Sequence, residues 1–215
     1  MAASTGSARA PLTRDRVLVA ALRLIDERGL DELTMRALGA ELGVEAMSIY
    51  KHVPSKGAVL DGVVELLLAE LETGRPSSTE WRAHLADLAR RFRAVSLAHP
   101  SAFPLLRRRS LSAYEVGRGM TEGALETMIA GGFTRDEAIA ALRTVVRFTL
   151  GFALSDPREG MASGGAPPGT TLPVADDHPL VSALMRAVTD PDGEEQLFEF
   201  GLAAVIRGIE PVAGR

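Results

Sequence analysis

Hydrophobic residues recur along most of the chain at intervals of three and four, and strict alternation of hydrophobic and polar residues is rare. Three- and four-residue spacing places hydrophobic side chains on one face of an α-helix, whereas alternation is typical of a β-strand. Ala, Leu, Arg and Glu, which favour helices, dominate the stretches between prolines. The pattern therefore predicts an all-α protein of about nine or ten helices.

Helix start and stop signals divide the chain further. Ser77 with Glu80 and Thr134 with Glu137 have the spacing of capping boxes, each just before a hydrophobic-periodic run. The expected helices run from Thr13 to Gly29, from Thr34 to Gly43, over 45–52, from Ser55 to Gly74, and over 80–98, 101–109, 113–130, 135–155, 178–189 and 193–209. Residues 156–177 are rich in Pro, Gly and Ser, which predicts a mobile loop.

The segment 33–63 has the pattern of a helix-turn-helix. Its first helix carries Leu38 on a hydrophobic face and Gly39 where a second helix could approach closely. Gly43 suits the left-handed conformation of a sharp turn, and Val44 would pack behind it. In the second helix, Ile49 would face the core together with Val53. In a DNA-binding helix-turn-helix, the second helix lies in the major groove.

The residues left on the outer face have the chemistry for DNA contact. Lys51 can donate to guanine, Ser48 can bond several bases, and small or apolar side chains can contact a thymine methyl. The candidates for base contact are Arg36, Ala46, Met47, Ser48 and Lys51, and the candidates for phosphate contact are Thr34, Tyr50, His52 and Lys56. The alternative interpretation is two packed helices joined by Gly43 without any DNA contact.

The run Ile49-Tyr50-Lys51-His52-Val53-Pro54-Ser55-Lys56 resembles the segment that closes the recognition helix in the tetracycline-repressor family of bacterial regulators. The resemblance implies a flexible tail over 1–12, a three-helix DNA-binding domain over 13–60 and a larger helical effector-binding and dimerisation domain over 61–215. It implies a homodimer that binds a palindromic operator and is released by a small-molecule effector. It also implies phosphate contacts by Tyr50, His52 and Lys56. The middle helices do not match the family's tetracycline-binding pattern, so a tetracycline–magnesium ligand is not expected.

Aromatic and aliphatic residues of the larger region could line an effector pocket or simply form the core. Pockets between helices are largely hydrophobic, with a few polar groups that orient the ligand. The pocket candidates are Leu67, Leu71, Trp81, Leu85, Leu88, Phe92, Phe103, Leu106, Leu125, Met128, Arg147 and Phe148. Arg143 and Arg147 lie four residues apart, and either one orients an anionic ligand or both lie on a solvated edge, the interpretation that we favour. A largely hydrophobic effector is expected.

The last expected helix has two hydrophobic faces. One carries Phe198 and Leu202, and the other carries Leu197 with the small residues Gly201 and Ala204. A helix that is hydrophobic on two sides needs two partners. The second face, together with the helix over 135–155, predicts a four-helix dimer interface, unless both faces pack within one chain.

Composition excludes several other classes of protein. The chain has no cysteine, so it has no disulfide framework and no cysteine metal site. The four histidines lack metal-ligand spacing, and no catalytic motif has its required context, so we expect no enzyme, no metal and no cofactor. No stretch is long enough to span a membrane and no signal peptide is evident, which fits a cytoplasmic protein.

The net charge of −4 does not by itself favour a nucleic-acid partner. Residues 1–60, however, hold eight Lys or Arg against seven Asp or Glu, so the acidity belongs to the rest of the chain. DNA binding would then depend on a few placed cations rather than on a broad positive field. A DNA-binding protein without any effector is the second hypothesis, but some 150 residues beyond the DNA-binding part are excessive for that role.

Overall fold

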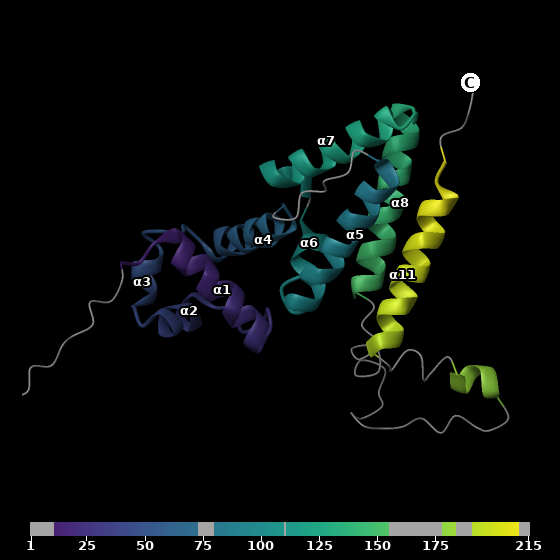
Figure 1. Cartoon of the computed structure of the whole chain (residues 1–215). Coiled ribbons are helices and arrows are strands. Elements are labelled where there is room, and N and C mark those ends of the chain that lie inside the picture. The colour runs from purple at the N-terminus through teal and green to yellow at the C-terminus, as the bar shows by residue number, and fades with distance from the viewer. Residues whose placement is uncertain (1–10, 73–79, 110, 155–177, 184–190, 211–215) are drawn as a thin grey trace, which may run out of the picture. The chain divides into compact units, whose positions relative to one another are not determined.

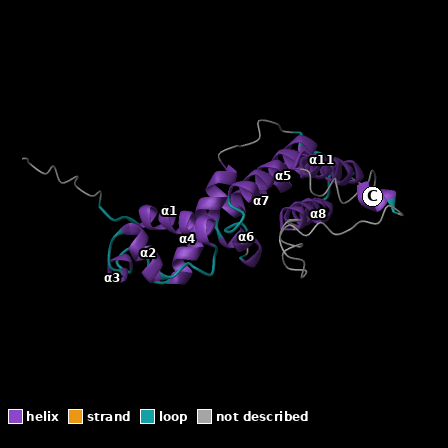
Figure 2. Cartoon of the chain, turned by 90° about the horizontal axis from the view of Figure 1, so that it is seen from below, coloured by secondary structure: helices purple, strands orange, loops and turns teal. Residues whose placement is uncertain are grey.

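The computed structural model describes residues 11–72, 80–109, 111–154, 178–183 and 191–210. These residues form helices joined by turns, and no β-strand occurs among them (Figure 2). The all-α prediction is confirmed. The chain divides into two compact units, one comprising Met1–Glu70 with His99–Ser110 and the other Leu71–Ala98 with Leu111–Arg215.

The first unit holds four helices near the N-terminus and one short helix from the middle of the chain (Figure 1). They are α1 (Arg14–Arg28), α2 (Met35–Leu42), α3 (Ala46–Ile49), α4 (Lys56–Glu72, of which the last two residues belong to the second unit) and α6 (Pro104–Arg108). The unit has its own hydrophobic core, to which each of these helices contributes. The fully buried side chains include Leu18, Ile25, Leu38, Ile49, Val59, Val63, Leu67 and Phe103.

The second unit consists of longer helices. They are α5 (Trp81–Ala98), α7 (Glu115–Ala130), α8 (Arg135–Leu154) and α11 (Pro191–Gly208), with a short 3₁₀ helix η1 (Leu111–Ala113) before α7. Trp81 and Phe133 pack edge to face with ring centres 4.8 Å apart, and Phe148 stacks on Phe198 at 5.8 Å. Residues 179–183 are also helical.

Side chains cap several helices as the sequence predicts. Thr13 Oγ1 accepts a hydrogen bond from the Arg16 amide at 3.3 Å, and Ser55 Oγ accepts one from the Ala58 amide at 3.1 Å. The capping box of Thr134 and Glu137 is confirmed, because each side chain accepts a hydrogen bond from the other residue's amide at 3.4 and 2.8 Å.

Several expected boundaries are wrong. The helix expected over 101–109 is only Pro104–Arg108, because Pro104 lacks the amide hydrogen that an interior helix position needs and suits the first turn instead. The helix expected over 80–98 agrees with α5, and Glu80 caps it by accepting a hydrogen bond from the Ala83 amide at 2.9 Å. Ser77, the loop expected over 156–177 and residues 184–189 lie outside the described residues.

The expected domain boundary at residue 60 lies inside α4, which is one continuous helix from Lys56 to Glu72. The compact units separate after Glu70, and residues 99–110 belong to the first unit. The expected domain bounds stay a prediction. Among the described helices, none is long and hydrophobic enough to cross a lipid bilayer.

Candidate nucleic-acid interface

The turn between α2 and α3 has the backbone geometry of a helix-turn-helix. Gly43 is left-handed, with φ 65° and ψ 39°, and the Val44 amide donates a hydrogen bond to the Gly39 carbonyl at 2.9 Å. A left-handed residue just after a helix favours glycine, because a β-carbon is strained there. The predicted role of Gly43 is therefore confirmed.

Burial in this unit fixes which side of α3 faces outward. Ile49 and Val53 are 0% and 1% exposed, as predicted, while Val44 is half-buried. The neighbouring Met47 and Tyr50 are 72% and 42% exposed. Met47 and Tyr50 therefore lie on the outward side of α3 and its following turn.

The recognition helix is shorter than predicted. It covers Ala46–Ile49 rather than 45–52, and Tyr50, Lys51 and His52 follow in a turn. In this turn the His52 amide donates to the Ile49 carbonyl at 2.8 Å. Pro54 keeps the helix from continuing through Val53, because the residue before a proline is disfavoured in helical conformation.

The structure brings the predicted DNA-contacting residues together on α2, α3, the following turn and the start of α4. Arg36, Met47 and Lys51 are exposed, and Ala46 and Ser48 are half-buried. The four phosphate candidates, Thr34, Tyr50, His52 and Lys56, are all exposed. The Thr34 hydroxyl already accepts a hydrogen bond from the Ala37 amide at 3.0 Å, which leaves its hydroxyl hydrogen to donate.

Three of these residues are cations that no carboxylate of the described chain neutralises. Arg36, Lys51 and Lys56 form no ion pair with a described residue. By contrast, Arg23 of α1 pairs with Glu27 and Glu41. Exposed cations near the starts of α2 and α4 and in the turn after α3 can bind phosphate oxygens and release counterions.

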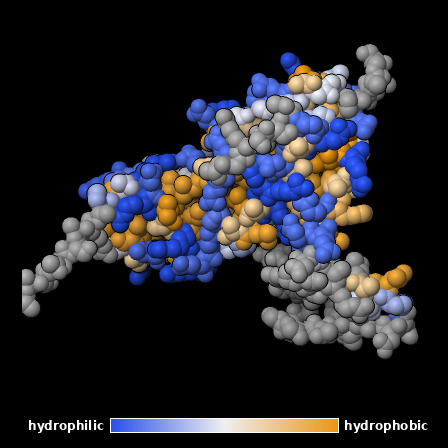
Figure 3. All heavy atoms as spheres, in the orientation of Figure 1, coloured by the Kyte–Doolittle hydropathy of each residue, from blue (hydrophilic) through white to orange (hydrophobic). Residues whose placement is uncertain are grey.

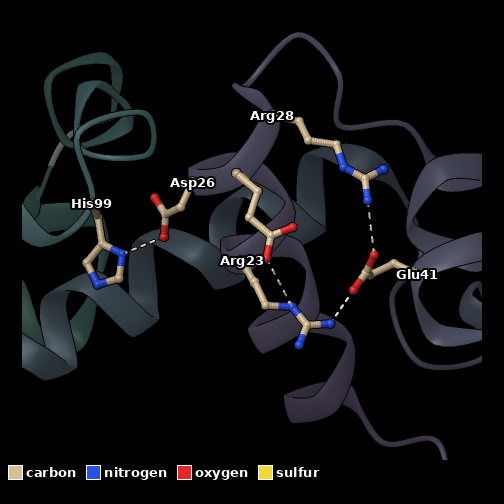
Figure 4. A network of polar contacts seen from close by, with 6 residues as sticks. Arg23, Asp26, Arg28, Glu41 and His99 are labelled. Atoms are coloured by element: carbon tan, nitrogen blue, oxygen red, sulfur yellow. Dashed lines mark hydrogen bonds and ion pairs between the residues drawn. The ribbon is translucent and has the colours of Figure 1, made fainter.

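A polar network that sequence reasoning missed holds α2 on α1 (Figure 4). Glu41 of α2 accepts hydrogen bonds from Arg23 and from Arg28 of α1, the latter at 3.4 Å. In the same view, Asp26 of α1 pairs with His99, which follows α5 in the chain. These partners lie far apart in the sequence and have no fixed spacing, so no local pattern signals them.

The effector-pocket candidates are divided between the two units. Leu67, Phe103 and Leu106 are buried in the first unit. In the second unit, six candidates are buried, namely Leu71, Trp81, Leu85, Leu88, Phe92 and Met128, while Leu125 and Phe148 are half-buried. Whether these residues line a pocket stays a prediction.

The arginines of the second unit are placed in a way that the sequence did not indicate. Arg143 and Arg147 are both exposed, which agrees with a solvated edge of α8. Arg93 of α5 is instead 9% exposed, with its guanidinium 5.1 Å from the Phe152 ring centre. Its nearest carboxylates, on Glu194 and Glu195, are 3.8 and 3.9 Å away.

Comparisons with known proteins agree with this geometry. Residues 17–63 match the family described as "Bacterial regulatory proteins, tetR family", and residues 73–213 match "Tetracyclin repressor-like, C-terminal domain". The chain is 34% identical to the class D tetracycline repressor protein of Escherichia coli, over 94% of this chain and 90% of that protein.

Two solved structures are similar along the chain. One is the Streptomyces coelicolor TetR-family protein ActR in complex with actinorhodin, with a TM-score of 0.68 and 28% identity over 93% of this chain and 96% of that one. The other is BioQ with its double-stranded DNA operator, with a TM-score of 0.59 and 27% identity over 72% of this chain and 93% of that one. The chain therefore belongs to the tetracycline-repressor family of bacterial transcriptional regulators.

Proposed function

We propose that this chain is a repressor that binds a palindromic DNA operator as a homodimer and leaves it when a small-molecule effector binds. The observation that carries the proposal is the set of exposed residues on and after α3, which includes Met47, Tyr50 and Lys51. The DNA-bound relative BioQ and the ligand-bound relative ActR support the two halves of this function. Such a protein acts in the cytoplasm, where bacterial DNA lies.

In the proposed complex, α3 and its following turn enter the major groove. Arg36, Met47 and Lys51 reach base edges, Lys51 as a donor to guanine and Met47 as a partner for a thymine methyl. Ala46 and Ser48 support these contacts from half-buried positions. Thr34, Tyr50, His52 and Lys56 hold the phosphates and so set the register of the protein on the duplex.

Exposed hydrophobic side chains on α8 and α11 support the homodimer. Phe200 and Leu197 of α11 are 71% and 38% exposed, and Ile139 of α8 is 39% exposed. The opposite side of α11 is buried in the monomer through Phe198 and Leu202. Figure 3 shows hydrophobic and hydrophilic side chains intermingled on the surface of the second unit, which contains α8 and α11. Two copies of α8 and α11 would cover the hydrophobic faces in a four-helix interface.

Effector control follows from the helix that the two units share. We propose that a largely hydrophobic effector, bound among the candidate residues, shifts α4. This helix begins at Lys56 beside the DNA-contacting turn and continues without interruption to Glu72 in the second unit. A shift of α4 changes the separation of the two recognition helices, which must match half-sites about 34–36 Å apart.

The test begins with genomic DNA fragments captured by the purified protein, which identify the operator. Tyr50→Ala should leave the circular dichroism spectrum unchanged and weaken binding to all captured sequences. Arg135→Ala, an exposed change at the start of α8, is the matched control and should bind as the wild type does. Equal affinity of wild type and Tyr50→Ala would refute the assigned DNA surface.

A further inference from the structure

His99 lies between two carboxylates that come from different helices. Its Nδ1 is 2.7 Å from Asp26 Oδ2 on α1, and its Nε2 is 3.1 Å from Glu70 Oε2 on α4. The side chains of His99 and Asp26 are only 17% and 23% exposed. All three residues belong to the first unit, so the contacts lie within one compact body.

This geometry requires a particular protonation state. A neutral imidazole has one N–H donor and one bare nitrogen, whereas an ionised carboxylate only accepts hydrogen bonds. Two carboxylates can be satisfied together only by an imidazolium, which donates from both nitrogens. Asp26 depends on this proton in addition, because its Oδ1 is buried and has no hydrogen-bond partner among the described residues.

The charges around His99 favour its protonated form. Burial lowers the pKa of His99, but the hydrogen bond with Asp26 and the charges of Asp26 and Glu70 outweigh burial and raise the pKa above its ordinary value of 6.5. Asp26 of α1 and Glu70 of α4 are the charged groups that face the ring from the packed helices. Two cations of the same unit are engaged elsewhere, Arg109 with Asp61 and Arg23 with Glu41.

The position of this cluster in the chain gives it mechanical importance. The chain passes from the first unit to the second after Glu70, and it returns at His99, immediately after α5 ends at Ala98. The Glu70–His99 contact therefore joins the outgoing and the returning segments, and the Asp26 contact fastens both to α1. Residues 71–98 of the second unit are joined to the first unit through these two segments.

We propose that His99 is a proton-dependent positioning residue, whose imidazolium fastens the two connecting segments to α1 and thereby favours the operator-binding arrangement of the homodimer. This proposal rests on the proposed function. When the proton is lost, one of the two contacts is lost and the connection gains freedom. Binding to two half-sites at once then loses more conformational entropy, so affinity for the palindromic operator falls as the pH rises through the raised pKa of His99.

The first experiment follows the histidines directly in the full-length protein. Carbon-13 labelling of the histidine rings gives NMR signals whose shifts report protonation, and His99→Gln identifies the signal of His99. We expect that signal to titrate above pH 6.5, and Asp26→Asn to lower its midpoint. A His99 signal that titrates at or below pH 6.5 would overturn the proposal.

The second experiment compares a palindromic operator with a single half-site across pH 6 to 9. His52 and the other DNA-contacting groups act once on a half-site and twice on a palindrome, so the ratio of the palindromic affinity to the square of the half-site affinity isolates the restraint between the two DNA-binding units. For the wild type this ratio should fall about fivefold to tenfold with rising pH, within the range of typical allosteric coupling. In His99→Gln the ratio should be as low at every pH as the wild-type ratio is at high pH. The control His178→Gln should behave as the wild type does.

The possible failures are distinguishable. A wild type that binds no operator at any pH would overturn the proposed function, while the NMR titration would still decide the charge of His99. If the protein binds its operator but the ratio depends on pH in His99→Gln as it does in the wild type, the proposal for His99 is overturned. The proposed function is then left intact. Circular dichroism of His99→Gln and Asp26→Asn confirms that each variant is folded.

Discussion

The carbonyl oxygen of Val44 lies so close to Gly39 that a β-carbon at residue 39 would come within 2.8 Å of it. Gly39→Ala should therefore destabilise the protein by about 1–3 kcal/mol, because backbone atoms of the turn must move apart. Urea unfolding measures this loss. Gly119→Ala in α7 is the matched control, since its β-carbon meets no atom within 4 Å, and it should be neutral or stabilising by up to about 1 kcal/mol. Equal effects of the two changes would contradict the close approach.

Base contacts and phosphate contacts should respond differently to substitution. Lys51→Ala should weaken binding to the natural operator by about 1–3 kcal/mol and have a smaller effect on operators altered at the base pair that Lys51 reads. Lys56→Ala should weaken binding to all sequences similarly. It should also reduce the slope of the logarithm of the binding constant against the logarithm of the salt concentration by about 1. Binding titrations over a range of salt and operator variants separate the two patterns. A uniform loss in Lys51→Ala would contradict its role in base recognition.

The exposed phenyl ring of Phe200 should be part of the dimer interface. Phe200→Glu places a charge on the exposed side of α11 and should yield a monomer in analytical ultracentrifugation. Ile129→Glu on α7 is the control, because Ile129 is also exposed, at 46%, but lies on a helix outside the proposed interface. A Phe200→Glu variant that sediments as the wild-type dimer does would show that α11 uses another face.

Stability should fall in acid through an ion pair between α5 and α11. Arg90 Nε and Nη2 donate to Glu199 Oε1 and Oε2 at 2.6 and 2.7 Å. The hydrogen bonds from Arg90, aided by its charge and opposed by burial, lower the pKa of Glu199 below its ordinary value of 4.5. A lowered pKa in the folded state contributes stability above pH 4.5, and this contribution is lost as the pH falls through the lowered pKa.

Glu199→Gln should accordingly lower the melting temperature at pH 7 and make it less sensitive to pH below 4.5. Thermal unfolding between pH 3 and 7 measures both effects. Glu126→Gln is the control, because Glu126 is exposed on α7 and forms no ion pair with a described residue. If the two variants had the same acid profile, the Arg90–Glu199 pair would not contribute to stability.

Much of the architecture is predictable from local patterns. The three- and four-residue periodicity, the caps at Thr13, Thr34 and Ser55, and the Gly43 turn locate the first helices, and the structure confirms them. The Tyr-Lys-His segment after α3 is also recognisable from its residues, although it was expected to be helical and forms a turn. These features depend on interactions within a few residues, so the necessary information lies in a short window of sequence.

The predictions were wrong for two helix boundaries and did not single out the buried arginine. The recognition helix ends at Ile49, before Tyr50, Lys51 and His52, and α6 begins only at Pro104. Sequence reasoning singled out Arg143 and Arg147, whereas packing buries Arg93. Which arginine is buried depends on how α5, α8 and α11 pack together, and no local rule describes that packing.

The amino-acid order alone was sufficient for the helical class, the helix-turn-helix and the chemistry of its outer face, because each follows from short-range spacing. Tertiary structure alone decided which charges meet. Asp26 and His99 are 73 residues apart, and Arg23 and Glu41 are 18 apart. Such pairs form only when hydrophobic packing brings their helices together, so their existence could not be predicted before the core was known.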